Sequence, residues 1–357
     1  MFPTQSGLVD ARPQPGPLLT GTPVSAPAPR PAARNNAFTA DDFGVPSPAP
    51  GQDSFSERHV MNIPSAINAG LFVQFIANQW NSSGPTTSLT GQQVVWADGN
   101  PVAAGKTYTV LQTFYANDLA TDFDKRPGSV PKGRVTIGIV AADAADENDV
   151  VVAVRGTSTI WEWLQDCKFL YKPFANVPGA PLTEDGFTDM YLSFSFTNPP
   201  AAGAVTFIAG LIGMLPPKAR VTVVGHSLGA ALATLLALDL AVHSTELPVN
   251  LYTLASPRVG DPSFARLFDH IVPNAFRVAN RIDVVPKVPP PLMYLHVGDE
   301  TELVPDGTLR FDLACEHHLT SYFHMLGGLT VPSQADQYPI QPDCLRNSGA
   351  LGRPEVA

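Results

Sequence analysis

A serine between two glycines is the residue of this 357-residue chain best placed for covalent chemistry. A β-branched run from Val221 leads into Gly225–Gly229 (Gly-His-Ser-Leu-Gly), and an Ala- and Leu-rich helical pattern follows at once. This pattern predicts a strand, a sharp turn that carries Ser227, and a helix whose first N–H groups lie beside the hydroxyl. Larger residues at the two glycine positions would collide with the neighbouring strand and helix. The alternative is a turn that only closes a strand–helix unit; in either case His226 is predicted to be structural.

A serine nucleophile requires a base and a carboxylate, and both occur downstream. Asp283 follows a predicted strand at 275–280, in a loop that several prolines stiffen. Three histidines lie between residues 315 and 324, and His317 or His318 is the candidate base. Taken alone, Asp283 is more readily a turn or capping residue. After a serine turn, however, the order serine, carboxylate, histidine is the order that a triad of this kind requires.

The segments around these candidates resemble the class 3, or fungal-type, lipase family of the α/β-hydrolase fold. They follow one another in the family order between about residues 105 and 325. One departure is Glu184–Asp185, which stands where the family usually has a histidine. Six segments carry the resemblance: Val151–Thr157, Ser158–Asp166, Gly186–Phe187, Gly225–Leu232, Leu254–Asp261 and Arg277–Pro290.

The resemblance implies a catalytic triad of Ser227, Asp283 and one histidine. The pattern His-x-Leu-x-x-Tyr, common in relatives, fits when its histidine is His317 and its tyrosine is Tyr322. A shorter His-Leu-x-Tyr form would favour His318, but the tyrosine then falls one residue too late. We therefore predict His317 as the base, with His318 as the alternative.

The resemblance also suggests an oxyanion hole and a lid. By analogy, the backbone N–H groups of Thr157 and Leu228 would hold the oxyanion. Ile160, Trp161 and Trp163 fall in the segment that resembles the family's lid, where they would contact the substrate. The alternatives are a tight turn after a strand at Thr157 and ordinary core packing for the two tryptophans.

The predicted fold is α/β: an α/β-hydrolase with a mostly parallel central sheet flanked by helices, an antiparallel N-terminal portion and a lid helix. The apolar stretch 201–215 is too short to span a membrane and is predicted to be a buried helix packed on the sheet. The other expected elements are a helix at 63–80 and strands at 107–115, 134–142, 149–155, 249–255 and 275–280.

Composition suggests three regions. Residues 1–52 are rich in Pro, Ala, Gly and Ser and are predicted to be a disordered extension. Residues 53–345 would form the lipase-like domain, and residues 346–357 a flexible tail. The N-terminus shows no secretory signal, which favours a cytoplasmic protein or export by another route. Of the three cysteines, Cys315 and Cys344 could pair, whereas the odd number favours a reducing compartment.

Charge and motifs exclude several function classes. The net charge of −10, without basic runs, argues against nucleic acid and against docking on anionic membranes, but not against a neutral oil surface. No metal-ligand spacing, phosphate-binding loop or dinucleotide fingerprint is present, so neither a metal nor a cofactor is implied. The oligomeric state is not indicated.

These observations lead to an expected function. The chain is expected to be a serine carboxylic-ester hydrolase that cleaves acylglycerols, a triacylglycerol lipase, with a lipid or ester substrate and an oil–water interface as partners. The alternatives are a short-chain or feruloyl-type esterase or a phospholipase on the same fold. A ligand-binding protein without activity is the alternative from another class, and its usual sign, a lost triad residue, is absent.

Overall fold

The computed structural model describes residues 60–95, 106–117, 133–156, 169–203, 205–305, 307–330 and 344. All of these belong to one unit, which spans residues 48–357. The predicted extension, 1–52, and tail, 346–357, lie outside the described residues, as do Thr157, Ile160, Trp161, Trp163 and Cys167. The domain boundaries therefore stay predictions.

An eight-stranded sheet forms the centre of the described part, in the order β1-β2-β3-β4-β7-β8-β9-β10. The first four strands pair antiparallel, and β4 then pairs parallel with β7, which begins the parallel half. This confirms the predicted antiparallel start and mostly parallel sheet. The strands are β1 (Gln93–Val95), β2 (Thr107–Asn117), β3 (Arg134–Asp143), β4 (Asp149–Val154), β7 (Arg220–His226), β8 (Val249–Leu254), β9 (Ala275–Asn280) and β10 (Asp299–Leu303). A separate hairpin consists of β5 (Tyr171–Pro173) and β6 (Leu182–Glu184).

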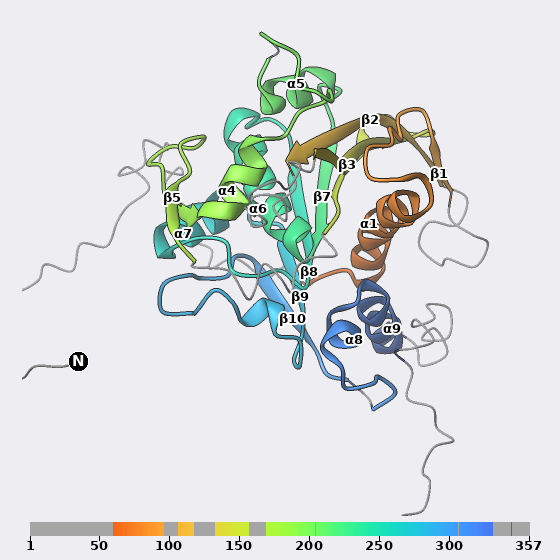
Figure 1. Cartoon of the computed structure of the whole chain (residues 1–357), viewed down its shortest axis with the longest axis vertical. Helices are drawn as coiled ribbons and strands as arrows, with labels where there is room; N and C mark the ends of the chain where they lie inside the picture. Colours follow the sequence, from red (N-terminus) through yellow and green to blue (C-terminus); the bar gives the residue numbers. More distant parts are fainter. Residues whose placement is uncertain are drawn as a thin grey trace, which may run out of the picture. The chain divides into compact units, whose positions relative to one another are not determined.

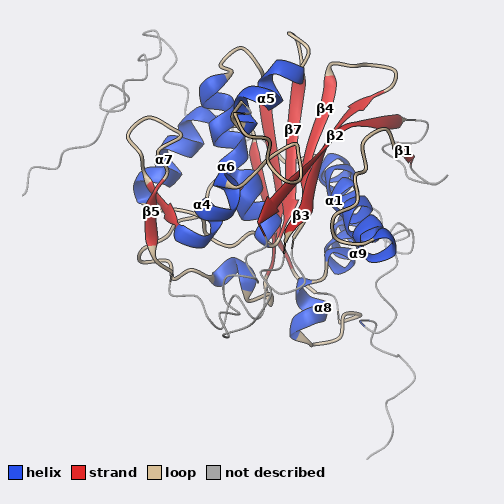
Figure 2. Cartoon of the chain, turned by 45° about the horizontal axis from the view of Figure 1, so that its top comes forward, coloured by secondary structure: helices blue, strands red, loops and turns tan. Residues whose placement is uncertain are grey.

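Helices cover both faces of the sheet (Figure 1 and Figure 2). One face is covered by α1 (Ile63–Ser83) and α9 (Leu319–Thr330), which pack on each other and, with the sheet, enclose one apolar cluster. The other face is covered by α6 (Leu228–His243), with α4 (Asp185–Leu192) and α7 (Pro262–Ile271) packed against it. Because α6 lies between the sheet and these helices, its residues from Leu228 to Leu240 are all buried. The helix that follows the serine is thus packed between the sheet and the outer helices.

The predicted buried helix at 201–215 is partly wrong. Helix α5 (Phe207–Met214) is shorter than expected, and Leu211 is its one buried residue. It packs on α6, and Phe207 at its start contacts Phe114 of β2. The helix starts late because Thr206 caps it, accepting a bond from the Ala209 N–H, and Pro216 follows its end. Within the described ranges, no helix has the length and apolar character needed to cross a bilayer.

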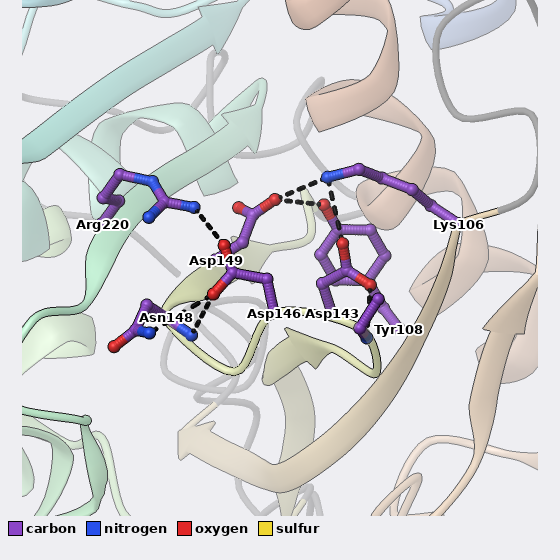
Figure 3. A network of polar contacts seen from close by, with 8 residues as sticks. Lys106, Tyr108, Asp143, Asp146, Asn148, Asp149 and Arg220 are labelled. Atoms are coloured by element: carbon purple, nitrogen blue, oxygen red, sulfur yellow. Dashed lines mark hydrogen bonds and ion pairs between the residues drawn. The ribbon is translucent and has the colours of Figure 1, made fainter.

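A network of charged side chains ties the strands together at the edge where β4 and β7 begin (Figure 3). Lys106 Nζ lies 3.0 Å from Asp143 Oδ2 and 2.8 Å from Asp149 Oδ2, and Arg220 lies 2.7 Å from Asp146. The hydrogen bond to Asp149 raises the pKa of the Lys106 ammonium, so Lys106 stays charged. Asp149 is the first residue of β4 and Arg220 is the first residue of β7. These contacts therefore support the β4–β7 register at the end of the strands opposite to Ser227.

A disulfide joins Cys315 and Cys344, with an S–S distance of 1.99 Å. This is the pairing that the sequence left open. The compartment stays a prediction.

Candidate active site

Ser227 occupies a strained turn between β7 and α6. Its φ of 59° lies in the left-handed region, which non-glycine residues rarely adopt. The Ser227 N–H donates to the Leu254 carbonyl at 3.0 Å, so the turn is held to the end of the neighbouring strand β8. The side chain is buried, with 1% exposure. The chain thus fixes a serine at the point where the predicted strand ends and the helix starts.

The flanking glycines are required by close backbone contacts. A Cβ at Gly225 would lie 2.1 Å from the Gly229 carbonyl oxygen, in the first turn of α6. A Cβ at Gly229 would lie 2.4 Å from the Arg155 carbonyl oxygen, just beyond β4. Both clashes involve backbone atoms, which cannot move aside as a flexible side chain could. The predicted collision with the neighbouring strand and helix is therefore present at both positions.

Gly229→Ala is expected to destabilise the fold by about 3 kcal/mol or more, because its methyl group would overlap the backbone beyond β4. Gly213→Ala is the matched control, since this helical glycine in α5 has no atom within 4 Å of an added Cβ. The control should be neutral or stabilising by up to about 1 kcal/mol. Thermal or urea unfolding of both variants measures the difference; equal stability of the two would contradict the packing described.

Ser227, His317 and Asp283 form one hydrogen-bonded chain. His317 Nε2 lies 2.7 Å from Ser227 Oγ, and His317 Nδ1 lies 2.8 Å from Asp283 Oδ2. Because the Asp283 carboxylate can only accept, Nδ1 carries the proton and Nε2 is free to accept the serine proton. Both distances suit proton transfer by a general base. This is the arrangement expected for a serine nucleophile, a base and an orienting carboxylate.

His318 does not reach Ser227. Its Nδ1 lies 2.9 Å from Thr320 Oγ1, and its backbone is extended (φ −66°, ψ 136°) because α8 (Leu313–His317) ends at the preceding residue. The two adjacent histidines therefore point to different partners. Of the two candidates from sequence, His317 is the one that the structure brings to Ser227.

Tyr322 supports the carboxylate from α9. Its hydroxyl donates to Asp283 Oδ2 at 2.8 Å and accepts the Asn280 N–H at 3.0 Å. Burial, followed by the negative charge of Asp283, raises the pKa of Tyr322, so its hydroxyl remains a donor. The Val285 N–H donates to Asp283 Oδ1 at 2.9 Å. From the sequence Tyr322 entered only through its spacing from His317, and its contact with the carboxylate was missed.

Tyr322→Phe is expected to lower kcat about tenfold, because a hydrogen bond to a charged group contributes about 1.5–3 kcal/mol. The ring stays in place, so KM should not change. Steady-state kinetics with a soluble ester measures this, and Tyr108→Phe, in the charged network at the far edge of the sheet, is the control. An unchanged kcat in Tyr322→Phe would show that Asp283 needs no support from this hydroxyl.

His226 is a structural residue that hydrogen-bonds to the backbone of the base. Its Nε2–H donates to the His317 carbonyl at 2.9 Å, and the two rings lie 4.8 Å apart. Burial lowers the pKa of His226, so the ring is neutral and adds no charge beside His317. The residue next to the nucleophile therefore holds the backbone of the base.

One of the two predicted oxyanion donors is described. Leu228 is the first residue of α6, so its N–H has no helical carbonyl to bond and lies beside the Ser227 hydroxyl. The other donor, Thr157, lies outside the described residues. Gly156, which precedes it, passes close to the turn: an added Cβ would lie 2.8 Å from the His226 carbonyl oxygen and 3.2 Å from Ser227 Cβ. Arg155 holds this segment to β3 through a 2.8 Å bond from Nε to the Thr136 carbonyl.

Comparisons with known proteins show similarity to lipases and phospholipases. Residues 151–293 match the family described as "Lipase (class 3)". "Phospholipase A1-II 3" from Oryza sativa subsp. indica is 34% identical over 219 residues, which cover 53% of this chain and 52% of the rice protein. The chain thus spans about half the length of the curated relatives it matches.

Two solved structures share the fold. A mutant form of MDLA from Penicillium cyclopium is 25% identical, with a TM-score of 0.50 over 72% of this chain and 86% of the other. A Rhizomucor miehei lipase in complex with its propeptide is 22% identical, with a TM-score of 0.50 over 73% of this chain and 75% of the other. The family match, the order of the motifs and the shared fold lead to one conclusion: residues 151–293 resemble the class 3 lipases, and the described fold is that of an α/β-hydrolase.

Proposed function

We propose that the protein hydrolyses the acyl ester bonds of lipids. The observation that carries this proposal is the chain of hydrogen bonds from Ser227 Oγ through His317 to Asp283, at the start of a helix whose first amide is free to bind an oxyanion. Its residue types and order match a serine-dependent acyl transfer. No triad member is lost, which argues against a binding protein without activity.

The reaction follows from these contacts. Ser227 Oγ attacks the ester carbonyl carbon while His317 Nε2 takes its proton, and Asp283 stabilises the imidazolium. The Leu228 N–H, together with Thr157 as predicted by resemblance, holds the oxyanion. His317 then protonates the departing alkoxide, and an acyl–Ser227 ester remains. Water attacks this ester with His317 as base, which releases the fatty acid and returns the proton to Ser227.

Triacylglycerol is the first candidate substrate. The family description is that of a lipase, and the net charge of −10 disfavours approach to anionic membranes but not to a neutral oil surface. Phospholipid is the second candidate, because the rice relative is named a phospholipase A1. That name denotes release of the acyl chain at the first glycerol position.

We also propose that the segment with Ile160, Trp161 and Trp163 acts as a lid. Ser227 and His317 are buried, with 1% and 6% exposure, so a lipid acyl chain needs an opening to reach them. Movement of an apolar segment at an oil surface would supply this opening and expose indole rings to the lipid.

The test is hydrolysis of glycerol esters from acetyl to oleoyl, below and above their solubility limits, beside phosphatidylcholine labelled at either acyl position. A rate that jumps when the insoluble glycerol ester phase appears, strongest on long chains, supports a lipase with a lid. Faster release from the first position of phosphatidylcholine would establish the second candidate. Activity confined to soluble short chains would make the protein an esterase, and hydrolysis no faster than with Ser227→Ala would overturn the proposed function.

A further inference from the structure

The Cys315–Cys344 disulfide is attached to the helix that carries the base. Cys315 belongs to α8, two residues before His317, and is joined to a cysteine 29 residues away in the sequence. The closed loop contains His317 and the whole of α9, which carries Tyr322. A second tie runs in parallel, because the Arg310 N–H donates to the Cys344 carbonyl at 2.8 Å.

The same disulfide packs on the segment that carries the acid. Cys315 and Cys344 are buried, with 5% and 4% exposure, and form a small apolar cluster with Leu309 against which Ile282 packs. Ile282 is the residue before Asp283. A hydrogen bond of 2.8 Å from Asn280 Nδ2 to the Glu316 carbonyl joins the two segments a second time. The bridge therefore contacts the neighbours of both the base and its carboxylate.

Helix α8 is short and buries few of its residues. It has five residues, too few for a helix that is stable by itself, and its first residue, Leu313, is 58% exposed. The buried residues of α8 are Cys315 and His317 themselves. The position of the imidazole thus depends on the disulfide, on the bonds from Asn280 and His226 to the backbone of Glu316 and His317, and on its own contacts with Ser227 and Asp283.

We propose that the Cys315–Cys344 disulfide is a positioning element for the reaction, which holds His317 in reach of Ser227 and Asp283; this rests on the proposed function. A dithiol that reduces the bridge supplies two electrons and two protons, yields two cysteine thiols and becomes a cyclic disulfide. Helix α8 then loses its covalent bond to residue 344. The His317 imidazole no longer keeps its hydrogen bonds to both Ser227 and Asp283. Activity would fall on reduction and return on oxidation.

Cys344→Ser tests this, because it breaks the bridge without changing α8. It is made in the wild-type chain and in His317→Ala, with Cys167→Ser as the control for loss of a cysteine outside the bridge. We expect kcat to fall on the order of tenfold to a hundredfold with KM unchanged, since a small misplacement of a catalytic group has effects of this size. In His317→Ala the same change should have no further effect, because the bridge acts through the missing imidazole.

Two results would overturn the proposal: an unchanged kcat in Cys344→Ser, or an equal loss of residual activity in the His317→Ala background, which would make the bridge merely structural. Should Cys344→Ser fail to fold, reduction and reoxidation of the folded wild-type protein, followed by circular dichroism, replaces it. Labelling of Ser227 by a neutral organophosphate is measured in parallel. It needs the base but no lipid, so it tests the bridge even where no lipid ester is hydrolysed and the proposed function fails.

Discussion

Ser227→Ala is expected to abolish ester hydrolysis, with a loss in kcat on the order of a millionfold, as when a triad serine is removed elsewhere. Among the described residues, the hydroxyl is the group placed to attack, and it makes a 2.7 Å bond to His317 Nε2. Its removal leaves the bond from the Ser227 N–H to the Leu254 carbonyl intact, so the fold should survive. Steady-state kinetics and thermal unfolding measure the two effects.

Ser263→Ala is the control for this change. Ser263 lies near the start of another helix, α7, where its hydroxyl donates to the Asp261 carboxylate. It should retain wild-type kcat. Activity in Ser227→Ala above background, with a folded protein, would mean that another residue is the nucleophile.

His317→Ala is expected to lower kcat nearly as far as Ser227→Ala, because a triad acts as a unit. His318→Ala should stay within a fewfold of wild type, since its ring contacts Thr320 and not Ser227. The two variants differ by one position in the chain and so form a matched pair. Kinetics on the same ester decides between them.

The opposite pattern, with His318→Ala inactive and His317→Ala active, would show that α8 ends at a different residue during the reaction. Equal losses in both variants would show that His318 is also needed for activity, because it positions the backbone of the adjacent His317. Either result would contradict the geometry described.

The serine turn could be predicted from sequence because its determinants are local. The strand, the glycines and the helix of Gly225–Gly229 follow one another, and the clashes that require Gly225 and Gly229 arise within this turn and the strand beside it. Asp283 could be predicted because it follows a strand that continues the parallel sheet. The choice between His317 and His318 rested on a family pattern, since the direction of each ring depends on where α8 ends.

Contacts between distant segments could not be predicted from the sequence. The bond from Tyr322 to Asp283 joins residues 39 apart, and the spacing that pairs Tyr322 with His317 carries no sign of it. The Cys315–Cys344 bridge could be named as a possible pairing, but nothing in the sequence supported it. Helix α5 was misjudged because its apolar composition is that of a buried helix, whereas its short length leaves Leu211 as its one buried residue. The composition of a segment shows that it could be buried, but not which other elements pack on it.

The measurement that tests the central claim most directly is mass spectrometry of the acyl-enzyme. The wild-type protein is mixed with a slowly hydrolysed long-chain ester, quenched in acid during turnover and digested. The account predicts one acyl group, on the peptide that contains Ser227, and none in Ser227→Ala. An acyl group on another residue, or turnover with no acylated Ser227 at any quench time, would contradict it.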